Sequence, residues 1–443
     1  MIKRGALHGK RLFSRDERPF FRIICFIIWR NDDEPIPDTA SPFFQEALFS
    51  NAGRDDGNII AASKKILEVC LDLSVSDVHL EPQKNGLRIR GRMDGVLQDL
   101  MRIPPVMQDA LISRYKIMAR MDIGEKRLPQ DGRIQMTYQD RSIDIRVSSL
   151  PTLYGETLVM RLLDSGKGLY SLDHLGFSKE NLERLYQLLH EPYGLILVTG
   201  PTGSGKSSTL YAILQALNES GRSLVTVEDP IEYQIDGISQ VAVHPKIGLT
   251  FARCLRSILR QDPDLIVVGE IRDRETAEMS VHAALTGHLV FSTLHTNTAV
   301  GAVSRLLDLG VDSYLVASAL KGIVAQRLLR RLCLQCRTAY AVGENSWERT
   351  YFSLKGPLHL FHASSCAHCR GTGYSGRLAV QEVFPFDEAC RQAAARGLGE
   401  KALLELGRQQ QVASLFEDGR AKVLAGETSP EEMLRVLGPL EKK

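Results

Sequence analysis

The sequence predicts an α/β protein, and three observations lead to that prediction. An apolar run of β-type residues, Leu195–Thr199, is followed by a glycine-rich turn and then by a helix pattern. Further apolar runs alternate with helix patterns after it, as in a parallel sheet covered by helices. Before this part, shorter segments alternate apolar and polar residues around tight turns, as antiparallel hairpins do. With 443 residues, the chain has room for two or three domains.

Composition indicates a globular chain and argues against some functions. Hydrophobic residues make up 44% of the chain and charged residues 24%, so a sizeable core can form. The net charge of +2 is too near zero to indicate nucleic-acid binding by charge alone. The most apolar run, Phe20–Trp29, is interrupted by Arg22, is too short to span a membrane and is followed by no small-residue cleavage site. We expect a buried strand there, with an interfacial membrane anchor as the alternative.

The clearest motif is Gly200–Ser207, GPTGSGKS, which fits the pattern G-x-x-x-x-G-K-[ST] of a phosphate-binding loop, or P-loop. Its glycines let backbone N–H groups turn toward a phosphate, and the following helix adds the positive end of its dipole. Lys206 can reach the β and γ phosphates, and the Ser207 hydroxyl can hold Mg²⁺. Because a strand precedes the motif and a helix follows it, a glycine-rich turn without a ligand is a poor alternative. The chain is therefore predicted to bind a nucleoside triphosphate.

Acidic residues follow two of the later strands. Glu228–Glu232 comes after the predicted strand Ser223–Val227, and Glu270 comes after the strand Leu265–Val268. Carboxylates at the carboxyl ends of parallel strands, beside a P-loop, suit Mg²⁺ binding or the activation of water.

Histidines and arginines supply further candidates. His288 and His295 bracket the predicted strand Leu289–Thr293, where they would be γ-phosphate sensors or interface contacts rather than purely structural residues. The predicted helix Phe251–Gln261 carries arginines on its polar face, and basic residues also crowd the hairpin region before the P-loop. Solvated surface charge is one interpretation of these cations, and contact with phosphate across a subunit boundary is the other.

Four of the eight cysteines form two CxxC pairs, Cys333–Cys336 and Cys366–Cys369. Two such pairs can place four thiolates around one Zn²⁺ ion. The stretch between the pairs is longer than in the commonest zinc ribbons, and His362 and His368 are spare candidate ligands. A closed four-cysteine site leaves no open coordination position, so it predicts a structural metal rather than a catalytic one.

The remaining segments give a coarse map. The proline-containing stretch of residues 31–56 resembles a linker, and residues 164–168 form a polar joint. His79 and Glu81 are expected to be structural, because two ligands are too few for a metal. The expected elements are a helix at Ile59–Leu71, a strand pair at Leu87–Gln98 turning at Asp94-Gly95, a hairpin turning at Gln139-Asp140, a capping box at Ser429–Glu432 and a helix stop at Gly438.

Several motifs, taken together and in order, resemble those of one family. They are SDVHLEP, GPTGSGKSS, TVEDPIEY, LRSILRQDPDLIVVGEIRD, TGHLVFSTLHTN and the two CxxC pairs. From about Asn58 onward the chain resembles the secretion ATPases, specifically the type II secretion and type IV pilus assembly ATPases of Gram-negative bacteria. The resemblance implies a homo-hexameric ring in the cytoplasm, peripheral to the inner membrane and docked on a polytopic platform protein. It also implies a PAS-like α+β domain followed by a RecA-like P-loop ATPase domain.

The resemblance sets expected boundaries and roles. Residues 1–57 would be an N-terminal remnant and linker, 58–163 the PAS-like domain, 164–172 a hinge linker and 173–443 the ATPase domain, with a zinc insert at about 330–378 and a helical tail at about 386–443. The residues implied to bind ATP are Gly200, Pro201, Thr202, Gly203, Ser204, Gly205, Lys206, Ser207 and Ser208. The arginines implied to meet the nucleotide are Arg127, Arg141, Arg256 and Arg260. Glu232 would be the general base, supported by Glu228 and Asp229. Glu270 would help to hold Mg²⁺, and His288 and His295 would couple the nucleotide state to domain position.

The implied function is a motor that hydrolyses ATP to drive pilin or pseudopilin assembly, in type IV pilus biogenesis or type II protein secretion. A pilus retraction motor is an alternative, but retraction members lack the four-cysteine insert. Near-neutral charge and the lack of an interleaved basic–aromatic patch disfavour a nucleic-acid motor. Intact Lys206, Glu232 and Glu270 disfavour a scaffold that does not hydrolyse ATP. The family usually has a larger domain before the PAS-like one, and about 57 residues precede the resemblance here. Docking is therefore expected to be incomplete or to use another partner.

Overall fold

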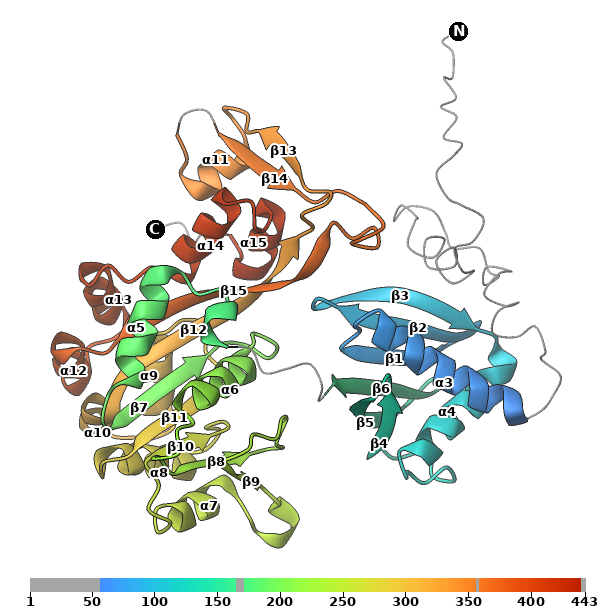
Figure 1. Cartoon of the computed structure of the whole chain (residues 1–443), viewed down its shortest axis with the longest axis horizontal. Helices are drawn as coiled ribbons and strands as arrows, with labels where there is room; N and C mark the ends of the chain where they lie inside the picture. Colours follow the sequence, from blue (N-terminus) through green and yellow to red (C-terminus); the bar gives the residue numbers. More distant parts are fainter. Residues whose placement is uncertain (1–55, 165–170, 356–357, 440–443) are drawn as a thin grey trace. The chain divides into compact units, whose positions relative to one another are not determined.

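The computed structural model describes residues 56–164, 171–355 and 358–439, which fold as two compact units (Figure 1). The expected strand at Phe20–Trp29 and most of the expected hinge at 164–172 lie outside the described residues. The α/β class predicted from the sequence is confirmed, with an antiparallel arrangement in the first unit and a mixed, mostly parallel sheet in the second.

The first unit is built on a six-stranded sheet in the order β3-β2-β1-β6-β5-β4. Strand β1 pairs antiparallel with both β2 and β6, and β2 pairs antiparallel with β3. Two helices, α3 and α4, pack against each other, and α4 also packs against β2 (Figure 1). The bounds are α3 Asp56–Asp72, β1 Asp77–Gln83, β2 Gly86–Met93, β3 Val96–Ile103, α4 Pro105–Met118, β4 Gln130–Tyr138, β5 Arg141–Thr152 and β6 Gly155–Asp164.

Both predicted hairpins of this unit are confirmed, and their turns explain them. Asp94 and Gly95 have φ angles of 46° and 85°, and Gln139 and Asp140 have φ angles of 48° and 61°. Two successive residues with positive φ match the right-handed twist of the flanking strands, which is the geometry that two-residue hairpins favour. The pairs join β2 to β3 and β4 to β5.

The second unit is built on a seven-stranded sheet in the order β15-β12-β7-β11-β10-β8-β9. All neighbouring strands run parallel except β15, which pairs antiparallel with β12. The strand bounds are β7 Gly194–Thr199, β8 Leu224–Glu228, β9 Ser239–Ala242, β10 Leu265–Val268, β11 Leu289–Leu294, β12 Leu320–Leu332 and β15 Tyr374–Pro385.

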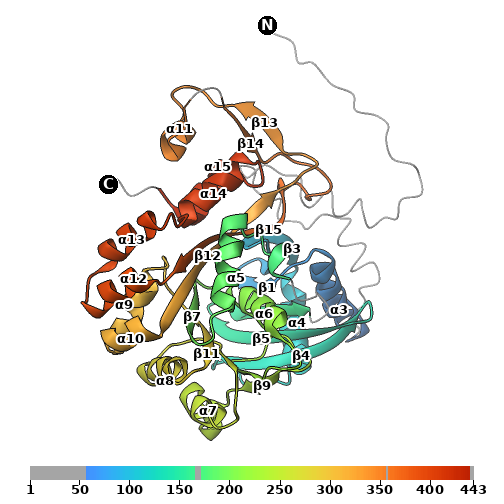
Figure 2. The same ribbon diagram turned by 60° about the vertical axis from the view of Figure 1, so that its left-hand side comes forward.

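Helices cover both faces of this sheet, because the inner strands are apolar on both sides. Helices α5 (Lys179–Leu189) and α6 (Lys206–Leu217) pack with Ile196 and Val198 on one face. Helices α7 (Phe251–Ile258) and α8 (Arg274–Leu285) pack with residues such as Leu197 on the other face, and they lie side by side (Figure 2). Helices α9 (Gly301–Asp308) and α10 (Ser313–Ala319) share that second face.

The C-terminal part contains a long antiparallel ribbon, formed by β12 and β15, that the sequence analysis did not predict. The ribbon joins the main sheet through β7, and it flanks the range of about 330 to 378 in which the zinc insert was expected. The smaller elements are η1 Leu172–His174, η2 Pro245–Ile247, β13 Thr338–Ala341, α11 Trp347–Phe352, β14 His359–His362, α12 Glu388–Ala395, α13 Glu400–Gln409, α14 Leu415–Leu424 and α15 Pro430–Leu437.

Two local expectations about helix ends also need correction. Helix α7 ends at Ile258 rather than at Gln261. At the start of α15, Ser429 caps the helix by accepting a hydrogen bond from the Glu432 backbone, but the Glu432 carboxylate accepts hydrogen bonds from Arg330 and Arg435. It serves as the acceptor for two guanidinium groups, so the predicted capping box is only half formed. The stop at Gly438 is confirmed.

Candidate nucleotide site and cysteine cluster

The P-loop leaves the sheet at the carboxyl end of β7, which lies between β11 and β12. Its backbone turns at Gly200, Gly203 and Gly205, which have φ angles of 154°, 79° and 89°. These angles are strained for residues with a side chain, so the glycines permit the turn. Helix α6 begins directly after Gly205, and no side chain caps it. Its first N–H groups therefore form the start of an anion-binding site.

Lys206 is buried inside this loop, with 9% of its surface exposed. Its ammonium group donates to the carbonyl oxygens of Gly200 (2.8 Å) and Pro201 (3.1 Å). Burial lowers the pKa of Lys206 to about 8, the charge of Glu270 raises it, and the charge of Arg327 lowers it. Because the ammonium group of Lys206 already lies against the loop, it can exchange these carbonyl acceptors for phosphate oxygens when a phosphate binds.

A further observation indicates that the loop fits a phosphate ligand. The hydroxyl oxygen of Ser204 is buried and finds no hydrogen-bond partner among the described residues. Such an orphaned group is costly inside a protein unless a ligand or water satisfies it. A triphosphate at the N-terminus of α6 would supply acceptors to this hydroxyl, to the loop N–H groups and to Lys206.

Glu270 is the acidic group whose charge acts on Lys206. It follows β10, and β11 separates β10 from the P-loop strand. Its carboxylate forms an ion pair with Arg272 and lies beside His295, whose Nε2 atom is 3.7 Å from a Glu270 oxygen. Burial lowers the pKa of His295, and the charge of Lys206 lowers it further. The structure thus brings Lys206, Glu270 and His295 into one electrostatic cluster.

His288 does not join this cluster. It precedes Leu289, the first residue of β11, and β11 runs parallel to β7 with Leu289 opposite Gly194. The P-loop follows the other end of β7, so His288 lies at the opposite edge of the sheet. Its Nδ1 atom lies 3.0 Å from the Ala283 carbonyl oxygen, which anchors it to the end of α8. His288 is therefore not placed to sense the γ-phosphate at the P-loop of its own chain, and its alternative role as an interface contact stays a prediction.

The acidic segment after β8 is organised by Tyr211 on α6. The carboxylate of Glu228 is buried and accepts hydrogen bonds from the Tyr211 hydroxyl and from two further side chains. The same hydroxyl accepts hydrogen bonds from the backbone N–H groups of Glu232 (3.1 Å) and Tyr233 (3.2 Å). Burial raises the pKa of Tyr211, so it stays a neutral donor. Glu228 thus holds the segment in place, while Glu232 and Asp229 are exposed at its surface.

Two functional candidates on β12 escaped the sequence analysis. Gln326 contacts the P-loop and α6. Arg327 is buried and donates to the Asn297 carbonyl oxygen (2.8 Å), and burial lowers its pKa. Both lie in a stretch without a recognisable motif, and a polar pair inside the apolar run Ile323–Leu329 is the one signal that could have found them.

The four predicted arginines fall into two groups. Arg256, on α7, pairs with Glu275, and Arg260 donates to the Arg256 carbonyl oxygen (2.6 Å). Both belong to the layer on the face of the sheet opposite α6. Arg127 and Arg141 belong to the strand and loop segments of the β1–β6 sheet, where Arg127 is highly exposed and pairs with Glu125 (2.8 Å).

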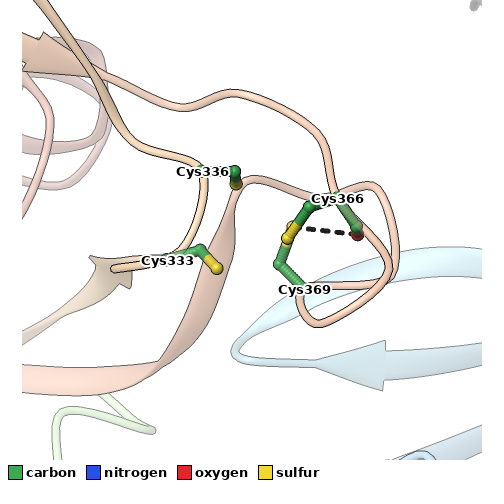
Figure 3. A group of neighbouring side chains, drawn as sticks. All are labelled: Cys333, Cys336, Cys366 and Cys369. Atoms are coloured by element: carbon green, nitrogen blue, oxygen red, sulfur yellow. Dashed lines mark hydrogen bonds between the residues drawn. The ribbon is translucent and has the colours of Figure 1, made fainter.

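The four cysteines of the CxxC pairs converge on one point, as Figure 3 shows. Their Sγ atoms all lie within 4.8 Å of one another, and Cys366 and Cys369 are 3.6 Å apart. Tetrahedral zinc with Zn–S bonds of about 2.3 Å requires S–S separations of roughly 3.8 Å. None of the four forms a disulfide with another described cysteine, and the Gly373 N–H donates to Cys369 Sγ (3.2 Å). The cluster fits a metal ion.

The histidines near these cysteines are not part of the cluster. Among the described residues, the only group of at least three candidate ligands that gathers on one point is the four cysteines. His362 instead packs near the ring of Tyr340. In the first unit, the His79 Nδ1 atom lies 3.9 Å from a Glu81 carboxylate oxygen, and Arg90 donates to Glu81 (2.5 Å).

Comparison with known proteins gives strong matches over most of the chain. A family model described as type II/IV secretion system protein matches residues 52–435. The type II secretion system protein E of Dickeya dadantii (strain 3937) is 47% identical over 384 residues, which cover 87% of this chain and 76% of that protein. The type II secretion system ATPase E of Vibrio cholerae is 47% identical over 382 residues, which cover 86% of this chain and 76% of that protein.

Solved structures give the same fold. The crystal structure of the pilus retraction motor PilT with bound ADP has a TM-score of 0.57 and 26% identity, and the match covers 84% of this chain and 95% of that one. The ATPase DotB of Yersinia pseudotuberculosis has a TM-score of 0.64 and 21% identity, over 93% of this chain and 97% of that one. At this identity the likeness to DotB concerns the fold alone. No helix within the described ranges is long and apolar enough to cross a membrane.

Proposed function

Since the chain belongs to the type II/IV secretion system protein family and is a P-loop secretion ATPase of the type II secretion ATPase E kind, we propose that it works as a hexameric motor. In this proposal, ATP hydrolysis in the cytoplasm drives the assembly of pilins or pseudopilins through a polytopic platform protein of the inner membrane. The first unit is the PAS-like domain and the second is the RecA-like domain. The observation that carries the proposal is the P-loop with Lys206 and Glu270 in one electrostatic cluster.

Each part of the site has a task in this proposal. The N–H groups at the start of α6 and the Lys206 ammonium bind the phosphates of ATP. Ser207 and Glu270 hold Mg²⁺, which supplies charge neutralisation to the transferring phosphoryl group when it is bound. Glu232 takes a proton from the attacking water, and the Tyr211–Glu228 pair keeps its segment in place. His295 orients Glu270.

The base assignment is tested by Glu232→Gln. This variant should still bind Mg·ATP, while turnover falls by roughly 10²–10⁴-fold, the usual contribution of a general base. Glu270→Gln is the comparison variant. Because it removes a proposed Mg²⁺ ligand, its affinity for nucleotide should depend less on the Mg²⁺ concentration. A Glu232→Gln protein that hydrolyses ATP as fast as the wild type would show that another group is the base.

A ring would give the four arginines a role at the nucleotide. Arg256 and Arg260 lie in the helix layer opposite α6, and Arg127 is exposed in the first unit, so they are available to a nucleotide on a neighbouring subunit. Positive charge from a neighbour would stabilise the γ-phosphoryl oxygens in the transition state. Specific activity should then rise with protein concentration, and mixing Arg127→Ala with Lys206→Ala subunits should restore part of the activity. Activity independent of concentration, together with a fully active Arg127→Ala protein, argues against a ring.

The four-cysteine cluster bears on the choice between assembly and retraction. The cluster holds structural Zn²⁺ in this proposal, because four thiolates close the coordination shell. The likeness to PilT favours retraction as the second candidate. The cysteine insert, which the resemblance associates with assembly members, favours assembly. Deleting the gene in its host distinguishes them, because loss of an assembly motor abolishes the fibre, whereas loss of a retraction motor leaves more of it.

A further inference from the structure

Strand β12 continues past the end of β7 and runs beside the P-loop. In the parallel pairing of the two strands, Ala325 lies opposite Thr199, the last residue of β7. The next residue of β12, Gln326, therefore lies beside Gly200, the first residue of the loop. Only 2% of the surface of Gln326 is exposed. A buried glutamine requires hydrogen-bond partners, and here both come from the nucleotide site.

The carboxamide of Gln326 joins the loop to the helix that follows it. Its Nε2 donates to the Ser204 carbonyl oxygen (2.8 Å) inside the P-loop. Its Oε1 accepts a hydrogen bond from the hydroxyl of Thr209 (2.7 Å), a fully buried residue on α6. One side chain thus fixes the distance between the middle of the loop and the second turn of the helix.

The bond to the Ser204 carbonyl also sets the direction of an N–H group. The carbonyl of Ser204 and the N–H of Gly205 belong to the same peptide unit, and in a trans peptide they point in opposite directions. Pulling the carbonyl toward Gln326 therefore turns the Gly205 N–H away from β12. That N–H lies at the N-cap of α6, among the groups available to an anion.

The glycines of the loop fit closely against Gln326. A Cβ atom at Gly200 would lie 2.5 Å from the Gln326 carbonyl oxygen, and a Cβ at Gly205 would lie 2.6 Å from its Nε2 atom. Both positions also have positive φ angles. Two of the motif glycines thus make room for β12 as well as for phosphate.

We propose that Gln326 is a positioning residue for nucleotide binding, which holds the P-loop in its phosphate-binding conformation through the Ser204 carbonyl and the Thr209 hydroxyl. The inference rests on the proposed binding of nucleotide by the P-loop. Gln326 lies 120 positions after Lys206 in the sequence, so the P-loop motif alone does not predict this role.

The test is the affinity of the purified full-length protein for Mg·ADP, measured by calorimetric titration. Gln326→Met keeps the length of the side chain and removes both hydrogen bonds, so it should raise the Kd by about tenfold. Thr209→Val removes one bond and should raise the Kd by about threefold, whereas Thr209→Ser keeps the hydroxyl and most of the affinity. Because the two residues act through one bond, the double variant should bind no more weakly than Gln326→Met alone.

Gln381→Met is the matched control. Gln381 lies directly opposite Gln326 on β15, is fully buried, and donates to the Leu175 carbonyl oxygen (3.3 Å), outside the loop. Its replacement should lower the melting temperature of the free protein and leave the Kd within about twofold of the wild type. In ATPase assays, Gln326→Met should raise KM much more than it lowers kcat, because the loop binds ground state and transition state alike.

Three results would overturn the inference. They are an unchanged Kd in Gln326→Met, an equal loss of affinity in Gln381→Met, and fully additive losses in the double variant. If Gln326→Met does not fold, an unchanged Kd in Thr209→Val contradicts the inference in its place. A wild-type protein that fails to bind Mg·ADP would instead contradict the proposed function.

Discussion

In the four-cysteine cluster the ligand atoms are the side chains that the CxxC motifs name, whereas in the P-loop the groups aimed at the ligand belong mainly to the backbone. The sulfur atoms of the cluster gather within 4.8 Å of one another. In the P-loop, β12 holds the peptide unit that carries the Gly205 N–H, through the hydrogen bond from Gln326 to the Ser204 carbonyl. A side-chain site can therefore be read almost completely from its motif, while a backbone site needs its neighbours as well.

Removing the one charged side chain of the P-loop should give the largest effect of these tests. Lys206→Ala deletes the buried ammonium group of the loop and should lower ATP turnover by at least about 10²–10³-fold, since an aligned charge donor is lost. The zinc content should stay the same, because the cluster is a separate site. A parallel loss of zinc would contradict the independence of the two regions.

Removing one thiolate should affect the zinc content and leave nucleotide binding unchanged. Cys366→Ser should lower the zinc content, measured by metal analysis, from about one ion per chain, and should lower the melting temperature, because structural zinc contributes to folding. The Kd for Mg·ADP should not change. Cys390→Ala, which replaces a buried thiol outside the cluster, should keep its zinc. Freshly purified wild-type protein without zinc would refute the metal assignment.

The pH dependence of nucleotide binding should report on Lys206. Burial lowers its pKa to about 8, and phosphate binds the charged form. Above that pKa the free lysine is neutral and binding requires proton uptake, so the Kd for Mg·ADP should rise about tenfold between pH 7 and pH 9. Phosphate, with a second pKa of about 6, stays ionised across this range. Lys206→Arg, which keeps its charge, should flatten the profile. A steep profile in that variant would assign the titration to another group.

The smallest effect is expected at a helix cap near the second CxxC pair. Ser429 accepts a hydrogen bond from the Glu432 backbone, and its hydroxyl lies 2.8 Å from the Tyr374 hydroxyl at the start of β15. Ser429→Ala should lower the free energy of unfolding by about 1 kcal/mol in denaturant titrations. Zinc content and nucleotide affinity should stay at wild-type values, since neither site uses this hydroxyl. A loss of zinc would show that the cap also orders the cluster.

Much of the candidate site could be predicted from the sequence, because its signals are local. The P-loop stands between an apolar strand and an amphipathic helix, and Glu270 follows an all-apolar strand. The turns at Asp94-Gly95 and Gln139-Asp140 formed the expected hairpins, and three of these four residues, the two aspartates and the glycine, are of types that accept positive φ angles. In each of these cases the physical cause lies in residues that are neighbours in the sequence.

Other features depended on long-range pairing. The ribbon of β12 and β15 was missed because strand pairing over long sequence separations leaves no local pattern. His288 and His295 look equivalent in the sequence, and the direction of β11 places them at opposite edges of the sheet. Glu432 was expected to complete a capping box, but the guanidinium groups of Arg330 and Arg435 offered its carboxylate stronger, charge-assisted partners.

The sequence by itself determined which reactive groups this protein carries: a glycine-rich loop with a lysine, carboxylates that follow two strands of the sheet, and two pairs of thiols. These are properties of residue type and short spacing. Only the tertiary structure decided which groups act together, since Gln326 meets the P-loop and Tyr211 meets the acidic segment through contacts between distant strands and helices. Hydrogen bonds depend on distance and direction over a few ångströms, and those are fixed only when the sheet has formed.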